Sequence, residues 1–171
     1  KVLLLKPDYV MAYYNMGHTL QDQGNLEEAI KAYSKALAIK PDYAEAYSYR
    51  GNVLQKLKQL DAAVIDHDMA IALMPEDAFA YLSKGSALKA LGKRDESLAY
   101  FKKSIALNPN SEEAYYYLGS TLALYRQYEE ASRYLIKSIK LRSDFHEAFL
   151  ALGIVQMNQC KFELAIDSFD K

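Results

Sequence analysis

The chain has 171 residues, of which 51% are hydrophobic and 25% charged, a composition typical of folded proteins and not of disordered ones. A formal net charge of −1 provides no basic excess for nucleic acid or an anionic membrane, and no apolar run approaches the roughly 18 residues that a spanning helix needs. The single cysteine excludes an internal disulfide framework and favours a reducing compartment, so we predict a cytoplasmic location.

The first complete unit of the chain, residues 10–43, has the pattern of two helices joined by a short turn. Between Val10 and Gln23, apolar and small side chains recur at spacings of three and four, which makes one stripe on a helix. A polar break at Gly24-Asn25 follows, and a second stripe runs from Leu26 to Ile39. The unit ends at Lys40-Pro41, because proline cannot continue a helix and disfavours helix in the residue before it.

The same pattern returns every 34 residues. The four prolines follow this interval, as do five glycines, and the other two glycines lie seven residues after members of the glycine series: Pro7, Pro41, Pro75 and Pro109; Gly17, Gly51, Gly85, Gly119 and Gly153; Gly24 and Gly92. A period of this length indicates a repeat architecture whose helix pairs cannot bury their apolar faces alone. We assign the units to residues 10–43, 44–77, 78–111, 112–145 and an incomplete 146–171.

Small and large side chains alternate where the two helices of a unit should meet. Gly17 on the first helix and Ala29 on the second allow their axes to approach to the roughly 8–10 Å of close helix packing. The large Tyr13 and Tyr33 then fill the space beside that contact.

These positions resemble the tetratricopeptide repeat family, whose motif places an aromatic residue, Leu-Gly, a mid-helix Tyr or Leu, Ala, an aromatic residue, Ala and Pro at fixed offsets. The first unit carries Tyr13, Met16-Gly17, Leu20, Ala29, Tyr33, Ala36 and Pro41. The resemblance covers essentially the whole chain and implies an all-α fold, a right-handed α-solenoid of antiparallel helix pairs. The departures are Arg50 and Lys84 before the glycine, Ser143 at the fifth proline position, and Arg126 and Cys160 at the loop glycine.

Both ends of the sequence fall inside repeats. Residues 1–9 are interpreted as the end of the second helix of a preceding unit, and the last unit stops at Lys171. Repeat arrays normally need polar caps, and neither end supplies one. We therefore expect a fragment of a longer chain that can associate with itself through these ends, Val2, Leu3 and Leu5 included.

No pattern for catalysis or metal binding emerges. His146-Glu147 begins a zinc-site motif, but its second histidine would have to stand at Leu150. Asp66-His67-Asp68 resembles a ligand cluster, yet adjacent residues of a helix point in different directions. Because His67 occupies the position of Tyr33 and Phe101 in other units, we interpret it as a core histidine. The prediction is therefore no enzyme, no cofactor and no metal.

The family resemblance also implies where a partner would bind, because the first helix of each pair lines the concave side of such a superhelix. Residues of these helices that are free of core packing describe the groove: Tyr14, Asn15, His18, Ser48, Tyr49, Asn52, Leu82, Ser83, Ser86, Tyr116, Tyr117 and Ser120, with Met11, Phe79, Leu150 and Ile154 on the same faces. Tyrosines there offer a large contact area with a polar tip, which suits an interface. The alternative is that Tyr14, Tyr49 and Tyr117 only pack on the neighbouring first helix.

Two recognition modes of the family can be compared residue by residue. The clamp that holds a terminal carboxylate needs a lysine and an arginine at set places, and no register of this chain provides that cationic pair. The repeat style is similar to bacterial members and to the arrays found with O-linked N-acetylglucosamine transferases, which hold peptide backbone with a ladder of asparagines. In this chain Asn15 alone occupies one of these asparagine positions, and the other positions hold Tyr49, Ser83, Tyr117 and Ala151.

The sequence thus predicts a non-enzymatic scaffold that binds a peptide or protein segment in a concave groove, with no nucleic-acid or membrane partner. One alternative stays open: the chain is the substrate-targeting arm of a larger enzyme, such as a glycosyltransferase, whose catalytic domain lies outside it.

Overall fold

The computed structural model describes residues 7–171, and this part of the chain forms ten α-helices and no strand. The helices are α1 (Pro7–Asp22), α2 (Leu26–Ile39), α3 (Ala44–Lys56), α4 (Leu60–Leu73), α5 (Ala78–Ala90), α6 (Arg94–Leu107), α7 (Glu112–Leu124), α8 (Tyr128–Leu141), α9 (His146–Asn158) and α10 (Phe162–Phe169). The predicted all-α class is confirmed.

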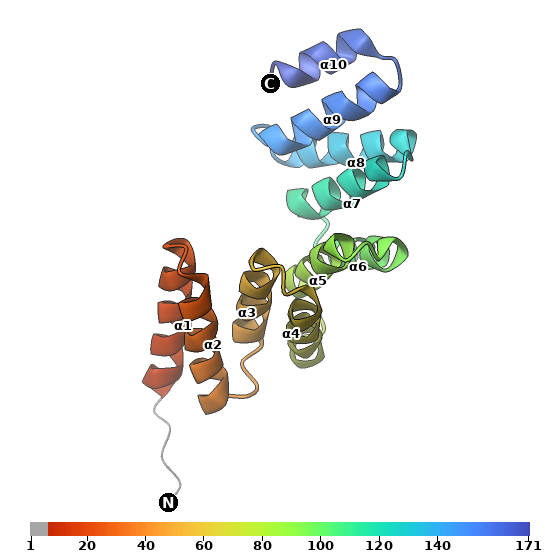
Figure 1. Ribbon diagram of the computed structural model, residues 1–171. Coiled ribbons are helices and arrows are strands. Elements are labelled where there is room, and N and C mark those ends of the chain that lie inside the picture. Colours follow the sequence, from red (N-terminus) through yellow and green to blue (C-terminus); the bar gives the residue numbers. More distant parts are fainter. Residues whose placement is uncertain (1–6) are drawn as a thin grey trace, which may run out of the picture. The chain divides into compact units, whose positions relative to one another are not determined.

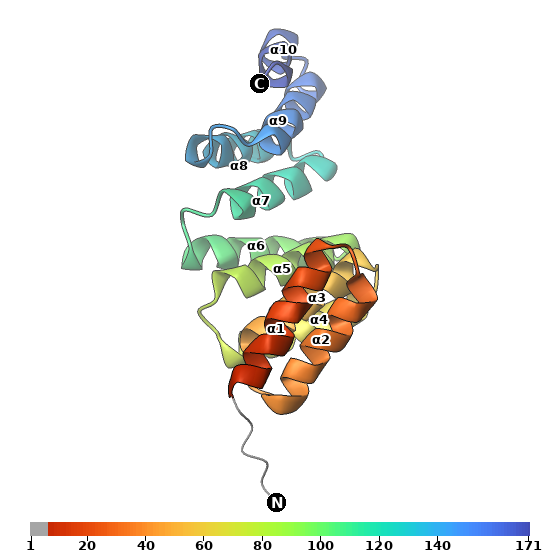
Figure 2. The same ribbon diagram turned by 90° about the vertical axis from the view of Figure 1, so that its left-hand side faces the viewer.

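The chain divides into two compact units, each larger than one repeat, with the boundary between Gly92 and Lys93. The first unit holds α1 to α5 and the second α6 to α10. Within the units, antiparallel hairpins pair α1 with α2, α3 with α4, α7 with α8 and α9 with α10 (Figures 1 and 2). The odd-numbered helices also contact one another, α3 with both α1 and α5 in the first unit, and α7 with α9 in the second. Each unit is therefore a stack of helix pairs.

The first helix begins earlier than the repeat pattern predicts. α3 starts at Ala44, after its turn proline, whereas α1 starts at Pro7 itself. Proline is compatible with the first position of a helix, where its missing N–H has no partner to lose. The rest of the predicted preceding helix, residues 1–6 with Val2, Leu3 and Leu5, lies outside the described residues.

Close packing within a pair depends on the glycines of the odd-numbered helices. A Cβ atom added to Gly17 would lie 2.7 Å from the ring of Tyr33, and one added to Gly119 would lie 2.9 Å from Cγ of Leu135. The side chains of Tyr33 and Leu135 are fully buried. The sequence predicted that Tyr33 fills the space beside a contact of Gly17 with Ala29; in the structure the ring of Tyr33 lies directly against Gly17.

The turns between paired helices share one backbone conformation. Gly24 and Gly92 have φ values of 80° and 75°, and the residues at the same place in the other pairs, Lys58, Arg126 and Cys160, have φ values of 62°, 61° and 60°. Replacing the loop glycine has therefore left the turn unchanged, at the cost of a left-handed conformation that L-residues disfavour.

Candidate functional site

The exposed face of the odd-numbered helices in the first unit carries a cluster of aromatic rings. Tyr14 and His18 are one helical turn apart on α1, and Tyr49 comes from α3. The ring centroids lie 5.8 Å apart for Tyr14–His18, 5.7 Å for Tyr14–Tyr49 and 4.5 Å for His18–Tyr49. All three side chains are half-buried. The structure thus brings three of the predicted groove residues together on two neighbouring helices.

Further side chains enlarge this cluster. The ring of Tyr43, just before α3, lies 5.1 Å from that of Tyr14, and its hydroxyl donates a hydrogen bond to Sδ of Met11 at 3.3 Å. On the other side, Phe79 from α5 lies 5.8 Å from Tyr49. Met11 and Phe79 are 48% and 42% exposed, so the cluster has apolar, accessible margins. We call these six residues, Met11, Tyr14, His18, Tyr43, Tyr49 and Phe79, the aromatic surface.

The phenols of Tyr14 and Tyr43 stay protonated at neutral pH. Burial is the largest cause that raises the pKa of Tyr14, and the neighbouring Tyr49, Tyr43 and Tyr33 raise it further. Burial likewise raises the pKa of Tyr43. A protonated phenol both donates and accepts hydrogen bonds, so these rings offer polar as well as apolar contacts.

The other predicted residues of the first unit contribute less. Asn15 is exposed, and Asn52, Leu82 and Ser86 are half-buried, but Ser86 Oγ already accepts a hydrogen bond from Gln55 Nε2 at 2.8 Å. Ser48 and Ser83 are buried, with 2% and 7% exposure. A serine side chain is too short to reach past its neighbours, whereas the tyrosine at the same position one repeat earlier, Tyr14 or Tyr49, does so.

In the second unit, Tyr116 repeats the geometry of Tyr14. Its ring lies 5.1 Å from Phe145, which precedes α9 as Tyr43 precedes α3. Tyr117 stacks on the buried Phe101 with 5.7 Å between centroids, and its carbonyl oxygen accepts a hydrogen bond from Ser120 Oγ. Tyr49 stacks on the buried Tyr33 in the same way, with 6.4 Å between centroids, so Tyr116 and Tyr117 repeat the places of Tyr14 and Tyr49, and both are half-buried. Exposed apolar side chains continue along this face on α9: Leu150, Ile154 and Met157.

The sequence did not predict that Tyr43 and Phe145 contact these tyrosines, because both precede a helix and lie outside the repeat motif; Tyr43 is half-buried and Phe145 is buried. A signal was present, since aromatic residues at this place occur where the first helix of the preceding pair carries Tyr14 or Tyr116. An aromatic side chain before a helix can close over a ring on the previous one.

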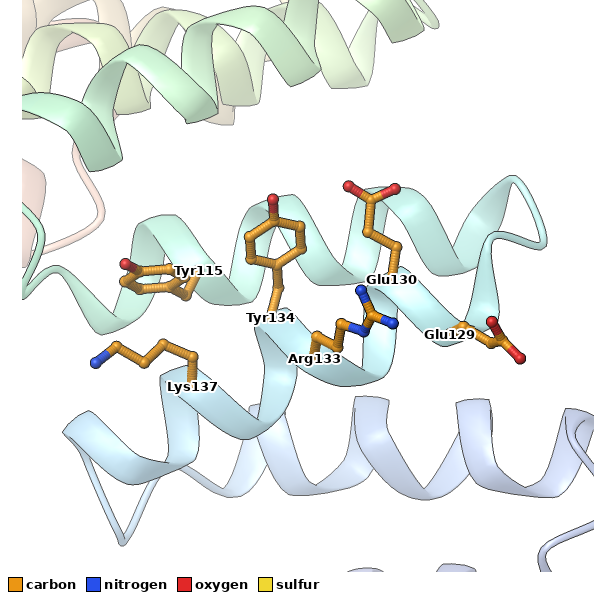
Figure 3. A pocket seen from close by; sticks show the side chains of 6 residues that line it. All are labelled: Tyr115, Glu129, Glu130, Arg133, Tyr134 and Lys137. Carbon is orange, nitrogen blue, oxygen red and sulfur yellow. The ribbon is translucent and has the colours of Figure 1, made fainter.

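A shallow pocket of about 470 Å³ opens between α7 and α8 and was not predicted (Figure 3). Tyr115 and Tyr134 stack there with 6.2 Å between centroids, and Lys137 Nζ lies 6.0 Å from the centroid of Tyr115. Glu129, Glu130 and Arg133 complete the lining. Charges of both signs line this pocket, so it selects no single ligand charge.

The Asp66-His67-Asp68 sequence does not form a ligand cluster. Asp66 accepts two hydrogen bonds from Arg50, both of 2.7 Å, and Asp68 pairs with Lys84. These contacts explain why Arg50 and Lys84 replace the apolar residue of the repeat motif. His67 is fully buried with neither ring nitrogen hydrogen-bonded, and burial, the largest cause, lowers its pKa to about 4. The predicted core role of this histidine is confirmed.

Within residues 7–171, no three or more His, Cys, Asp or Glu side chains gather in a way that could hold a metal ion. Over the same residues, no helix has both the length and the apolar character needed to cross a bilayer.

Comparison with known proteins identifies related repeats. Family models described as TPR repeat and tetratricopeptide repeat match residues 17–58, 80–111 and 100–131. No curated protein matches the sequence.

Several solved structures share the fold. MamA is 23% identical over 90% of each chain, with a TM-score of 0.77. PilF of Pseudomonas aeruginosa is 21% identical, with a TM-score of 0.87, over 95% of this chain and 74% of its own. YrrB, described as a TPR protein with an unusual peptide-binding site, is 25% identical, with a TM-score of 0.69, over 92% of this chain and 81% of its own.

Proposed function

Because the chain belongs to the tetratricopeptide repeat family, we propose that it is a non-catalytic scaffold that binds a peptide or protein segment on the faces of its odd-numbered helices. Such repeats generally bind proteins or peptides, and YrrB is described as having a peptide-binding site. The observation that carries the proposal is the aromatic surface of the first unit, in which Tyr14, His18 and Tyr49 are half-buried and in ring contact.

The aromatic surface suits an apolar or aromatic side chain of a partner. Its rings are held by one another and by α1, α3 and α5, so a ligand orders few additional torsions when it binds. Aromatic residues of this kind supply much of the binding energy at protein interfaces. The phenol groups then fix the orientation of the bound segment through hydrogen bonds to its backbone.

In the second unit, Tyr116 and the apolar side chains of α9 provide a second contact area. Leu150, Ile154 and Met157 follow one another at spacings of four and three, so they share one face of the helix.

A targeting arm for a larger enzyme is compatible with the same surfaces, since such an arm also binds protein segments. The two functions differ only in what the chain is attached to, and the proposed binding surface is the same for both.

The proposal can be tested with a random peptide library displayed on phage. Peptides selected on the chain should bind a Tyr14→Ala, Tyr49→Ala variant at least about tenfold more weakly, because loss of interface aromatics commonly costs 2 kcal/mol or more. Fluorescence anisotropy measures the dissociation constants.

The matched control is Tyr9→Ala. Tyr9 lies on α1 as Tyr14 does, is 57% exposed and is not one of the six residues of the aromatic surface. Peptides should bind this variant as they bind the unaltered chain. Equal affinity for the double variant and the control would contradict binding on the aromatic surface. Tyr117 is left unchanged, because it belongs to the second unit and not to the aromatic surface.

A further inference from the structure

Helix α4 exposes an apolar stripe that core packing does not use. Ile65, Met69 and Leu73 are 64%, 41% and 37% exposed, and Met74 after the helix is 41% exposed. The three helical residues are each four positions apart and therefore lie on one face, over about 12 Å of helix. We call these four residues the α4 stripe.

The same positions in other even-numbered helices show that the fold does not require apolar residues there. At the places of Ile65 and Met69, α2 carries Lys31 and Lys35, α6 carries Ala99 and Lys103, and α8 carries Arg133 and Lys137. All six of these residues are exposed. Only in α4 are both positions filled by large apolar side chains among helices α2, α4, α6 and α8.

The inner face of α4 carries two polar residues beside the buried Ala63 and Ala70. Asp66 and His67 are buried at 4% and 0% exposure, and Arg50 and Lys84 pair with Asp66 and Asp68. Polar groups in a core cost free energy unless they are paired, whereas apolar groups on a surface gain nothing until they are covered. The large apolar side chains of the α4 stripe therefore gain stability only when a partner covers the outer face of the helix.

The charges around the α4 stripe decide what covers it. Asp61 lies on the same face, four residues before Ile65, and the side chain of Asp68 at the margin is 54% exposed. The helix contains no lysine or arginine, and Glu76 follows it. A second copy docked through the same stripe would bring these carboxylates together, and an anionic membrane would be repelled.

We propose that the α4 stripe is a second docking site, whose occupant is an amphipathic helix of a partner protein with apolar residues on one face and lysine or arginine beside them. The apolar face covers Ile65, Met69 and Leu73, and the basic residues pair with Asp61 and Glu76. This site does not depend on the aromatic surface, so it stands or fails independently of the function proposed above.

Methyl NMR of the five methionines can locate such a helix directly. Met69 and Met74 report on the α4 stripe, Met11 on the aromatic surface, Met157 on α9, and Met16 on a separate part of α1; all five are exposed. The probe is a synthetic amphipathic peptide of leucine and lysine, about four helical turns long. We expect saturable shifts at Met69 and Met74 with the full chain, and none with a peptide that has glutamate in place of lysine.

The matched variant is Ile65→Lys, Met69→Lys, because lysines already occupy these positions in α2 without disturbing the fold. It should keep its helical circular dichroism, lose the shift at Met74 and bind the peptide at least about tenfold more weakly. A Tyr14→Ala, Tyr49→Ala variant should bind the peptide unchanged.

Three results would overturn the proposal. The peptide could bind the Ile65→Lys, Met69→Lys variant as tightly as the unaltered chain, or shift Met11 or Met157 and leave Met69 and Met74 unmoved. Alternatively, sedimentation could show a dimer that these two substitutions dissociate, which would make a second copy the occupant.

Discussion

At the scale of single residues, the turn between paired helices shows how a repeat tolerates an unfavourable side chain. Lys58, Arg126 and Cys160 occupy the place of Gly24 and Gly92 with the same positive φ. The left-handed conformation costs an L-residue about 1–2 kcal/mol, which the packing of the flanking helices outweighs. The conformation is thus imposed by the pair and not by the residue in the turn.

Lys58→Gly should therefore stabilise the protein by about 0.5–1 kcal/mol, because the relief of the left-handed strain exceeds the added entropy of the unfolded chain. Urea unfolding followed by circular dichroism measures the change. Lys31→Gly removes the same charge from the exposed middle of α2 and should instead destabilise by about 1 kcal/mol. A destabilised Lys58→Gly protein would show that the lysine side chain itself supports the turn.

At the scale of elements, the pairing of α3 with α4 depends on a buried ion pair where other pairs use apolar contacts. Arg50 donates two hydrogen bonds to Asp66 and one of 3.0 Å to Ser34 on α2. The hydrogen bond to Asp66 is the largest cause that raises the pKa of Arg50. The first pair has Met16 and Ala32 at the corresponding positions.

Arg50→Met alone should destabilise the protein by about 3 kcal/mol or more, because it leaves the Asp66 carboxylate buried without its partner. Adding Asp66→Ala restores the combination found in the first pair and should recover most of this loss. Chemical denaturation of the single and the double variant measures their free energies of unfolding, which can be compared with that of the unaltered chain. If the single variant were as stable as the unaltered chain, Asp66 would have to be solvated well enough to need no partner.

At the scale of the whole molecule, the two units differ in the titratable side chains that they bury. The first unit buries Asp66, His67 and Lys84, whereas residues 93–171 bury no charged or histidine side chain. Stacked repeats contribute separately to stability, so a change in pH can act on one unit more than on the other. The groups around His67 are Asp68, which raises its pKa, and Lys84, which lowers it.

The His67 pKa of about 4 lies below the unfolded value near 6.5, so the unfolded state binds the proton more readily. The stability that neutral His67 contributes is complete above pH 6.5 and decreases as the pH falls towards 4, by about 3 kcal/mol in total. His67→Phe, which copies Phe101 of the next unit, should remove this dependence. Methionine NMR can show that the first unit is the part that loses stability, because the signals of Met69 and Met74 should then change at a higher pH than the signal of Met157. A parallel pH profile for both proteins would contradict the prediction.

Much of the fold was predictable because the signals are local and repeated. Proline positions mark where pairs end, glycine positions mark where helices approach, and the spacing between them defines each pair. The same register placed Tyr14, His18 and Tyr49 on one face, and the structure brings their rings together.

Predictions were less complete where exposure depends on neighbouring helices. Ser48 and Ser83 have the register of surface residues, yet they are buried, because a serine side chain is too short to reach past its neighbours. Tyr43 and Phe145 lie outside any helical pattern, but each packs on a tyrosine in the first helix of the preceding repeat, Tyr14 and Tyr116 respectively. Such contacts join residues of different repeats, which a pattern within one repeat does not describe.

The amino-acid sequence by itself determined the all-α class, the helix pairs and the faces of the odd-numbered helices, because helix periodicity and turn residues act over short distances. Only the tertiary structure decided which partners the charged residues of α4 find. Arg50 on α3 pairs with Asp66, and Lys84 on α5 pairs with Asp68, and such contacts join different helices, which the periodicity of a single helix does not describe.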